Sequence, residues 1–171
     1  WGGGERDDVY FDEKNRIMFT AYRNNAPRIA EELARAGRKE DAKKLLDHID
    51  SSITQNAYAY NPYMIGGFDP SAYFMAMGYY NIGDKEGGRR VGNMFVKNLE
   101  ADINWILSLS ESRREGMVND VQRNLGIINA IGGLALTGGD EAYGKELEQK
   151  VQGLAERISK VMGPHVLQQQ R

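Results

Sequence analysis

Apolar residues recur at steps of three and four along most of this chain of 171 residues, the spacing that places side chains on one face of a helix. The pattern is clearest over residues 26–53, where two apolar stripes meet at Gly37. The stripes consist of Ala26, Ile29, Ala30 and Leu33 before the glycine and of Ala42, Leu45, Leu46, Ile49 and Ile53 after it. Because neither helix can bury its stripe alone, the pattern predicts an antiparallel hairpin that turns at Gly37.

A second hairpin matches the first position by position when Gly83 is aligned with Gly37. The alignment places Ala72 under Ala26, Met75 under Ile29, Ala76 under Ala30, Tyr79 under Leu33 and Gly88 under Ala42. The interval between the two glycines exceeds the usual tetratricopeptide period of about 34 residues by roughly the length of a loop expected over residues 54–69. The alignment therefore predicts an internal helical repeat of the tetratricopeptide type.

Helical patterns also cover the rest of the chain. We expect a helix from Lys14 that stops or kinks sharply near Asn25, because Pro27 would remove a hydrogen bond from a helix interior. Asp69-Pro70 and Asp140 are helix start signals. Further helices are expected over residues 70–82, 85–109, 111–137 and 141–162.

These elements predict an all-α fold, a tetratricopeptide-like right-handed superhelix of about three antiparallel hairpins. We expect one helical domain over residues 14–163, an extended lead-in over residues 1–13 and a flexible tail over residues 164–171. In the lead-in, Val9, Tyr10 and Phe11 form a small apolar island that should dock on the first hairpin.

Composition narrows the function classes. Charged residues make up 27% of the chain and the formal net charge is -2, so no overall field draws the protein to nucleic acid or to an anionic membrane surface. Because cysteine is absent, disulfides and thiolate metal sites are excluded. No run of about 18 apolar residues is present, so the sequence offers no membrane span. The chain begins at Trp1 without an initiating methionine or a signal sequence, and we interpret it as a fragment or a processed product.

No motif points to a catalytic, cofactor-binding or metal site. His48 and His165 have no further ligands at suitable spacing, so we expect His48 to be solvated. Residues 87–92, GGRRVG, look like a phosphate cradle, but no strand pattern precedes them and close helix packing explains the glycines better. Six carboxylates could be considered as acid–base groups, but nothing in the sequence buries them or opposes them to a partner, and we expect surface charges. They are Asp7, Asp8, Asp12, Glu13, Glu31 and Glu32.

The aromatic residues around the long loop form the remaining candidate. A candidate binding surface consists of Tyr58, Tyr60, Tyr63, Phe68 and Tyr73, since tyrosines with one apolar and one wet side suit such surfaces. We favour the other interpretation, that Tyr73, Tyr79 and part of Tyr80 pack in the core while the loop tyrosines cover its end.

Four segments carry a resemblance to a known family. They are VYFDEKNRIM at residues 9–18, YRNN at 22–25, IAEELARAGRKEDAKKLLD at 29–47 and AMGYYNIGD at 76–84. In these segments the chain resembles the C-terminal soluble domain of large bacterial multi-pass membrane proteins whose membrane part is similar to protein O-mannosyltransferases. The resemblance covers most of residues 8–110. Pro27, Gly88 and the loop over residues 54–69 depart from the family pattern.

The resemblance implies a helical-repeat module that follows the last membrane helix, on the extracytoplasmic (periplasmic) face of the inner membrane. The acidic catalytic residue of such transferases lies in a membrane-proximal loop outside this sequence, so the resemblance implies no catalytic residue, cofactor or metal here. We therefore expect a non-catalytic interaction domain whose partner is a protein or its own membrane portion, and not nucleic acid. The alternatives are a glycan-binding or small-ligand-binding module that uses the tyrosine loop, and a purely structural cap on the membrane portion.

Overall fold

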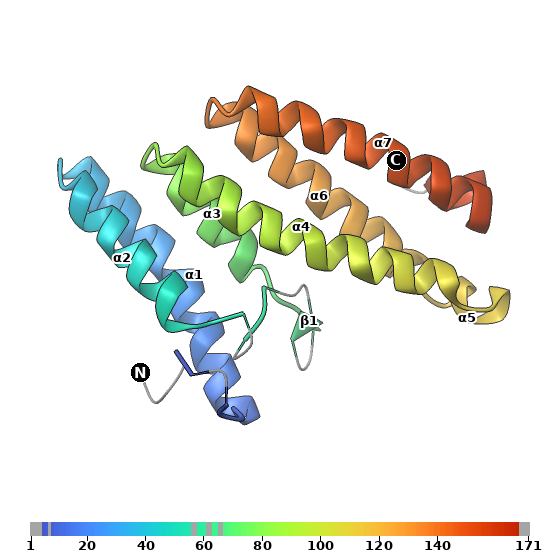
Figure 1. The fold of residues 1–171 in the computed structure, drawn as a ribbon, viewed down its shortest axis with the longest axis horizontal. Coiled ribbons are helices and arrows are strands. Elements are labelled where there is room, and N and C mark those ends of the chain that lie inside the picture. The colour runs from blue at the N-terminus through green and yellow to red at the C-terminus, as the bar shows by residue number, and fades with distance from the viewer. Residues whose placement is uncertain (1–4, 7, 56–57, 61–62, 65–66, 168–171) are drawn as a thin grey trace. The chain divides into compact units, whose positions relative to one another are not determined.

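The computed structural model describes residues 5–6, 8–55, 58–60, 63–64 and 67–167 (Figure 1). Within these ranges the fold is all-α, as predicted, apart from a pair of antiparallel two-residue strands, β1 (Tyr63–Met64) and β2 (Gly67–Phe68). The helices are α1 (Glu13–Arg35), α2 (Lys39–Ser52), α3 (Ser71–Asn81), α4 (Lys85–Ser108), α5 (Glu111–Glu115), α6 (Val118–Thr137), α7 (Glu141–Met162) and the 3-10 helix η1 (Pro164–Leu167). No helix in the described ranges combines the length and the apolarity that a bilayer crossing requires.

The residues group into two compact units, Trp1–Phe95 and Val96–Arg171, and the boundary between them falls inside α4. We call them the N-terminal and C-terminal units. Each has its own apolar core, which includes Leu46, Met75 and Tyr79 in the first and Ile103, Ile128 and Ile158 in the second. A single helical domain over residues 14–163 stays a prediction.

The helical hairpins turn at glycines with the same backbone geometry. Gly37, Gly83 and Gly139 have φ values of 79°, 86° and 76°, a left-handed conformation that costs glycine little. After each glycine, the next N–H bonds back to a carbonyl five residues earlier. These bonds run from Arg38 to Leu33 (2.9 Å), from Asp84 to Tyr79 (2.9 Å) and from Asp140 to Ala135 (2.8 Å). Each turn is thus a Schellman motif, and the alignment of Gly37 with Gly83 extends to Gly139.

Small residues lie where the helices of a hairpin approach most closely. A Cβ atom built on Gly88 would lie 2.7 Å from the ring of Tyr80, and one built on Gly144 would lie 2.5 Å from Leu136. Gly88 and Gly144 follow the turn glycine of their hairpins at the same interval, and Tyr80 and Leu136 precede it at the same interval. Close packing therefore explains Gly88, as the sequence predicts.

The expectation that the first helix stops near Asn25 is wrong, because α1 continues through Pro27 to Arg35. A sharp kink there stays a prediction. The side-chain amide of Asn25 donates to the carbonyl of Ala21 at 2.8 Å, one turn earlier in the same helix. Pro27 is buried, and its ring lies against Gly78 of α3, which has no side chain to exclude it. Packing of α3 on this stretch outweighs the local cost of the proline, about 3 kcal/mol in an isolated helix interior.

Two further segments differ from the sequence pattern, both in the C-terminal unit. The helix expected over residues 111–137 is divided into α5 and α6 at Gly116 and Met117. Residues 164–167, which the sequence assigns to the tail, form η1, and Val166 in it is buried. The described tail is therefore packed as far as Leu167, because one apolar residue in it finds a place in the core.

The lead-in docks on α1 through one of its three apolar residues. The ring of Phe11 is buried and meets that of Phe19 edge to face, with 4.9 Å between ring centroids. Tyr10 is 84% exposed and lies over the guanidinium of Arg16. Asp12 then caps α1, since its Oδ1 accepts a hydrogen bond from the N–H of Asn15 at 2.9 Å.

Candidate functional site

An arginine lies buried beneath the loop that joins α2 to α3. Arg23 of α1 is 0% exposed, and its guanidinium carbon lies 4.0 Å from the ring centroid of Tyr60 and 5.4 Å from that of Tyr58. One of its terminal nitrogens, Nη2, donates to the carbonyl of Ile53 at 2.9 Å. Nε and Nη1 have no hydrogen-bond partner in the described part of the chain. Cation–π contact with the two tyrosines therefore carries much of what stabilises this cation.

A buried carboxylate forms hydrogen bonds at the end of the same loop that leads into α3. Asp69 is buried, and its Oδ2 accepts hydrogen bonds from the hydroxyls of Tyr58 (2.8 Å) and Thr20 (3.1 Å). Its Oδ1 accepts from the N–H of Ser71 at 2.9 Å, at the start of α3. Asp69 therefore joins α1, the loop and α3 in one cluster, and the helix start that the sequence predicts at Asp69-Pro70 is present.

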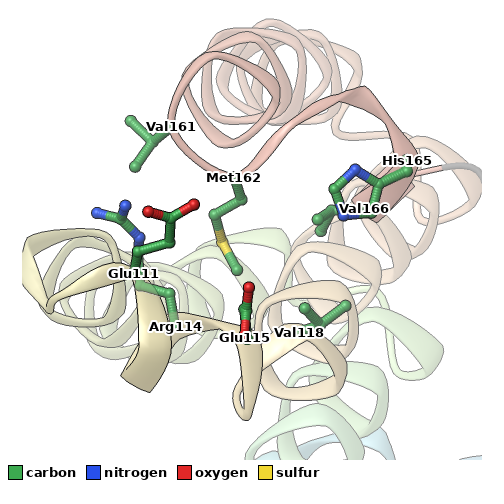
Figure 2. Close-up of a pocket in the computed structure, with 8 residues that line it drawn as sticks. All are labelled: Glu111, Arg114, Glu115, Val118, Val161, Met162, His165 and Val166. Atoms are coloured by element: carbon green, nitrogen blue, oxygen red, sulfur yellow. The ribbon is translucent and has the colours of Figure 1, made fainter.

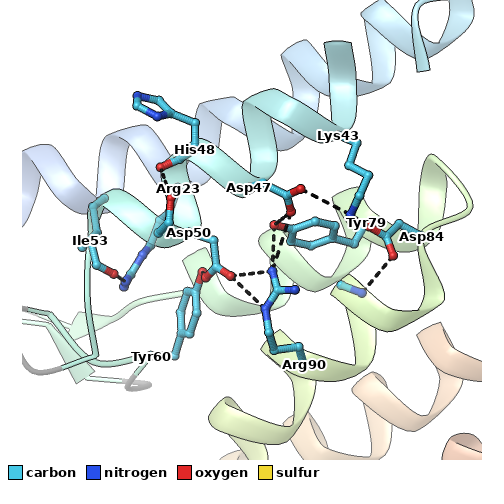
Figure 3. A network of polar contacts seen from close by, with 12 residues as sticks. Arg23, Lys43, Asp47, His48, Asp50, Ile53, Tyr60, Tyr79, Asp84 and Arg90 are labelled. Atoms are coloured by element: carbon cyan, nitrogen blue, oxygen red, sulfur yellow. Dashed lines mark hydrogen bonds and ion pairs between the residues drawn. The ribbon is translucent and has the colours of Figure 1, made fainter. Parts of the chain in front are cut away.

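A chain of polar contacts continues from the loop across α2, α4 and α3 (Figure 3). Tyr60 donates its hydroxyl to Asp50 at 2.8 Å, and Arg90 donates to the other oxygen of that carboxylate at 2.7 Å. Arg90 also donates to the hydroxyl of Tyr79 at 3.0 Å, which in turn donates to Asp47 at 2.9 Å. Each charged group in this network is paired with a group of opposite charge. The network therefore serves to hold the loop, α2, α3 and α4 together.

The buried phenols of this network stay protonated. Burial raises the pKa of Tyr60, and the neighbouring Asp50 adds to the rise while Arg23 opposes it. Burial likewise raises the pKa of Tyr79, with the carboxylates of Asp50 and Asp47 acting in the same direction. Tyr60 and Tyr79 are therefore hydrogen-bond donors at neutral pH, and neither is set up as a general base.

The network ends at an ion pair between α2 and the start of α4. Lys43 contacts both Asp84 and Asp47, and Asp84 also accepts a hydrogen bond from the N–H of Gly87 at 3.0 Å. Burial alone would raise the pKa of Asp84, but the hydrogen bonds from Lys43 and Gly87 outweigh it and hold the pKa below its ordinary value. Such a carboxyl group stabilises the fold above its unfolded pKa, and the contribution is lost as the pH falls through the folded pKa.

Replacing Lys43 by methionine should therefore change how stability depends on pH. We expect a loss of less than about 1 kcal/mol at pH 7, because the lysine is half exposed. Stability should fall less than in the wild type as the pH is lowered, since Lys43 no longer holds the pKa of Asp84 down. Urea unfolding between pH 3 and 7 measures both effects. Lys44→Met, at the exposed neighbouring position, is the control, and identical pH profiles for the two variants would contradict the assignment.

The outer side of this network is a shallow open depression on the surface of α2 and α4. It is lined by Lys43, Lys44, Asp47, His48, Asp50, Ser51 and Arg90. Two of its three cations, Arg90 and Lys43, are already paired with carboxylates. His48 is exposed, and no group of acidic, histidine or cysteine residues in the described ranges is arranged to hold a metal ion.

The structure separates the five candidate surface residues. Tyr60 is 1% exposed and belongs to the interior, where its ring covers Arg23, so it cannot form part of an exposed binding surface. Tyr58 and Tyr73 are half-buried. The side chains of Tyr63 and Phe68 lie outside the described part of the structure. The described loop tyrosines therefore fit the favoured interpretation, that they cover the end of the core.

Sequence reasoning missed the charged partners of these tyrosines. Arg23 had a detectable signal, because it lies at a three- or four-residue step between the apolar Phe19 and Ala26, on the stripe that α1 buries. The contacts of Asp50 with Arg90 and of Asp69 with Thr20 join positions far apart in the sequence, and no local pattern marks them.

Exposed apolar side chains gather on the opposite side of α1. Ile17, Met18, Tyr22 and Ile29 are between 38% and 51% exposed. Met18, Tyr22 and Ile29 follow one another at steps of four and seven, which places them on one helix face. The other face of α1 is buried and packs against α2 and α3. We call Met18, Tyr22 and Ile29 the α1 outer stripe.

Comparisons of the chain with models of protein families, with curated proteins and with solved structures find no match.

Proposed function

We propose that this chain is a non-catalytic, tetratricopeptide-like helical-repeat domain that binds a protein partner through the α1 outer stripe. The observation that carries the proposal is the exposure of Met18, Tyr22 and Ile29 on one face of α1. Single exposed apolar side chains are ordinary, but several on one face mark an interaction surface.

The polar chemistry of the N-terminal unit supports a scaffold role. The charged groups of the depression on α2 and α4 largely neutralise one another, and the tyrosines there donate to carboxylates. An acid–base catalyst needs a group whose pKa lies near the working pH and which reaches the substrate. The pKa values of Tyr60, Tyr79 and Arg90 are all raised, away from neutrality, by burial or by carboxylate contact.

The resemblance of four segments to a family of membrane proteins supplies the setting of the proposal. In this setting the chain is the extracytoplasmic part of a protein whose membrane portion resembles O-mannosyltransferases, and it presents acceptor proteins or organises the assembly. Apolar membrane segments encoded directly before Trp1 would support this setting, and a gene that encodes none would overturn it. Sugar transfer by the isolated chain would overturn the non-catalytic role.

The α1 outer stripe should tolerate charge without loss of stability. We expect the double variant Met18→Glu with Ile29→Glu to change the free energy of unfolding by no more than about 1 kcal/mol, because surface substitutions away from packed contacts cost within about 0.5 kcal/mol each. Gln149→Glu with Gln152→Glu, at two exposed positions of α7, adds the same charge and is the matched control. Urea denaturation measures both. A loss several times that of the control would mean that the stripe packs internally and is not a free surface.

A further inference from the structure

The C-terminal unit contains a small cavity where α5, α6, α7 and η1 meet (Figure 2). Its volume is about 110 Å³. It is lined by Glu111, Arg114 and Glu115 of α5, Val118 of α6, Val161 and Met162 of α7, and His165 and Val166 of η1. The cavity is independent of the tyrosine loop and of the α1 outer stripe, which belong to the N-terminal unit.

Of the two arginines of α5, only Arg114 lines the cavity, and it bonds to the end of α4. Arg114 donates from Nη1 to the carbonyls of Leu107 (3.3 Å) and Leu109 (3.0 Å), and so satisfies carbonyl groups at the end of α4. In the described part of the chain, no hydrogen bond or ion pair joins Arg114 to Glu111 or Glu115, and neither glutamate has another partner. Two carboxylates at the mouth of the cavity are thus left without a bonded cation.

The inner part of the cavity is apolar and held in place. Val118, Met162 and Val166 supply hydrocarbon and a thioether, and Val166 is almost fully buried. The side-chain amide of Gln122 in α6 donates to the carbonyl of Val166, which fixes η1 beside α6. In Figure 2 the carboxylate of Glu115 and the side chain of Met162 point toward the same space. The cavity therefore combines an apolar floor with an acidic mouth.

Size and charge together select the occupant. An apolar cavity of about 150 Å³ accommodates benzene, so this smaller one suits a chain of four or five heavy atoms. A lysine side chain has that size, with an aliphatic stem for the floor and an ammonium for the carboxylates. We propose that this cavity binds the side chain of an exposed lysine on a partner protein.

A titration of the whole chain with a lysine analogue tests the assignment. The probe is Nα-acetyl-lysine N-methylamide, and the methyl resonances of Val118, Met162 and Val166 report its binding by NMR. We expect saturable shifts in the millimolar range at low salt. The uncharged probe Nα-acetyl-norleucine N-methylamide, whose side chain is no larger, should bind at least about tenfold more weakly.

Two pairs of variants distinguish binding at the cavity from attraction of the charged probe to surface carboxylates in general. Glu111→Gln with Glu115→Gln should weaken binding of the charged probe at least about tenfold and leave the neutral probe unchanged. Glu148→Gln with Glu156→Gln removes two exposed carboxylates from α7 and should leave both titrations unchanged. Thermal unfolding verifies that each variant is folded. Equal binding of both probes, equal weakening by both pairs, or no methyl shifts with any probe would overturn the proposal.

Discussion

Replacing Arg23 by methionine is expected to lower the free energy of unfolding by about 1–3 kcal/mol, the cost of leaving a buried polar group without its hydrogen bond. The variant loses the cation–π contacts of Arg23 with Tyr58 and Tyr60. The carbonyl of Ile53 also loses its donor.

Two matched variants isolate the effect of Arg23. Arg28→Met changes an exposed arginine of the same helix and should alter stability by no more than about 0.5 kcal/mol. Arg23→Lys keeps the charge but loses the planar group that stacks on Tyr60, so its loss should lie between the other two. Urea denaturation followed by circular dichroism gives all three values. Equal losses for Arg23→Met and Arg28→Met would show that the loop does not depend on the buried cation.

Alanine at position 78 is expected to destabilise the protein by about 1–3 kcal/mol, although alanine is the better helix former. A Cβ atom there would lie 2.8 Å from the Cβ of Pro27 and 3.1 Å from its Cα. The Cα belongs to the backbone of α1, which cannot move aside as a flexible side chain would. Overpacking at the contact of α3 with α1 should therefore exceed the gain in helix propensity.

The same substitution at Gly153 is expected to change the stability in the opposite direction. Gly153 lies in α7 with nothing within 4 Å of a Cβ atom built on it, so Gly153→Ala should stabilise the protein by about 0.5–1 kcal/mol. Thermal and urea unfolding measure the stability change in both variants. The difference between them separates the cost of close packing at Gly78 from the gain in helix propensity. Stabilisation by Gly78→Ala would mean that α1 and α3 are not in close contact at Pro27.

One physical reason explains which structural predictions from the sequence are right and which are wrong. Gly37 and Gly83 are predictable because a left-handed turn residue between two apolar stripes is a local requirement, and each turn is closed by bonds within a few residues. Pro27 is misleading because its local preference is overruled by packing on Gly78, half the unit away in sequence. Propensity decides only where tertiary packing leaves it free.

In the candidate site, too, the local features could be predicted from the sequence and the long-range contacts could not. The sequence identified the aromatic loop as the unusual segment, but not that Tyr60 is covered or that Arg23 lies beneath it. Amphipathic residues such as tyrosine occupy cores and surfaces alike, so the choice depends on long-range partners. Those partners, Asp50 and Asp69, come from α2 and from the start of α3. The α1 outer stripe was equally hidden, because Ile29 reads as a core position in the repeat pattern and is exposed.

The most direct test of the proposed function is site-specific photo-crosslinking from the α1 outer stripe in cells that produce the protein. A benzophenone amino acid at Met18 should give one discrete crosslinked protein, and the product should disappear when Ile29→Glu is added. The same probe at Gln149 of α7 should not give that product. Identical products from both positions, or a product that persists with Ile29→Glu, would contradict a partner bound by this face of α1.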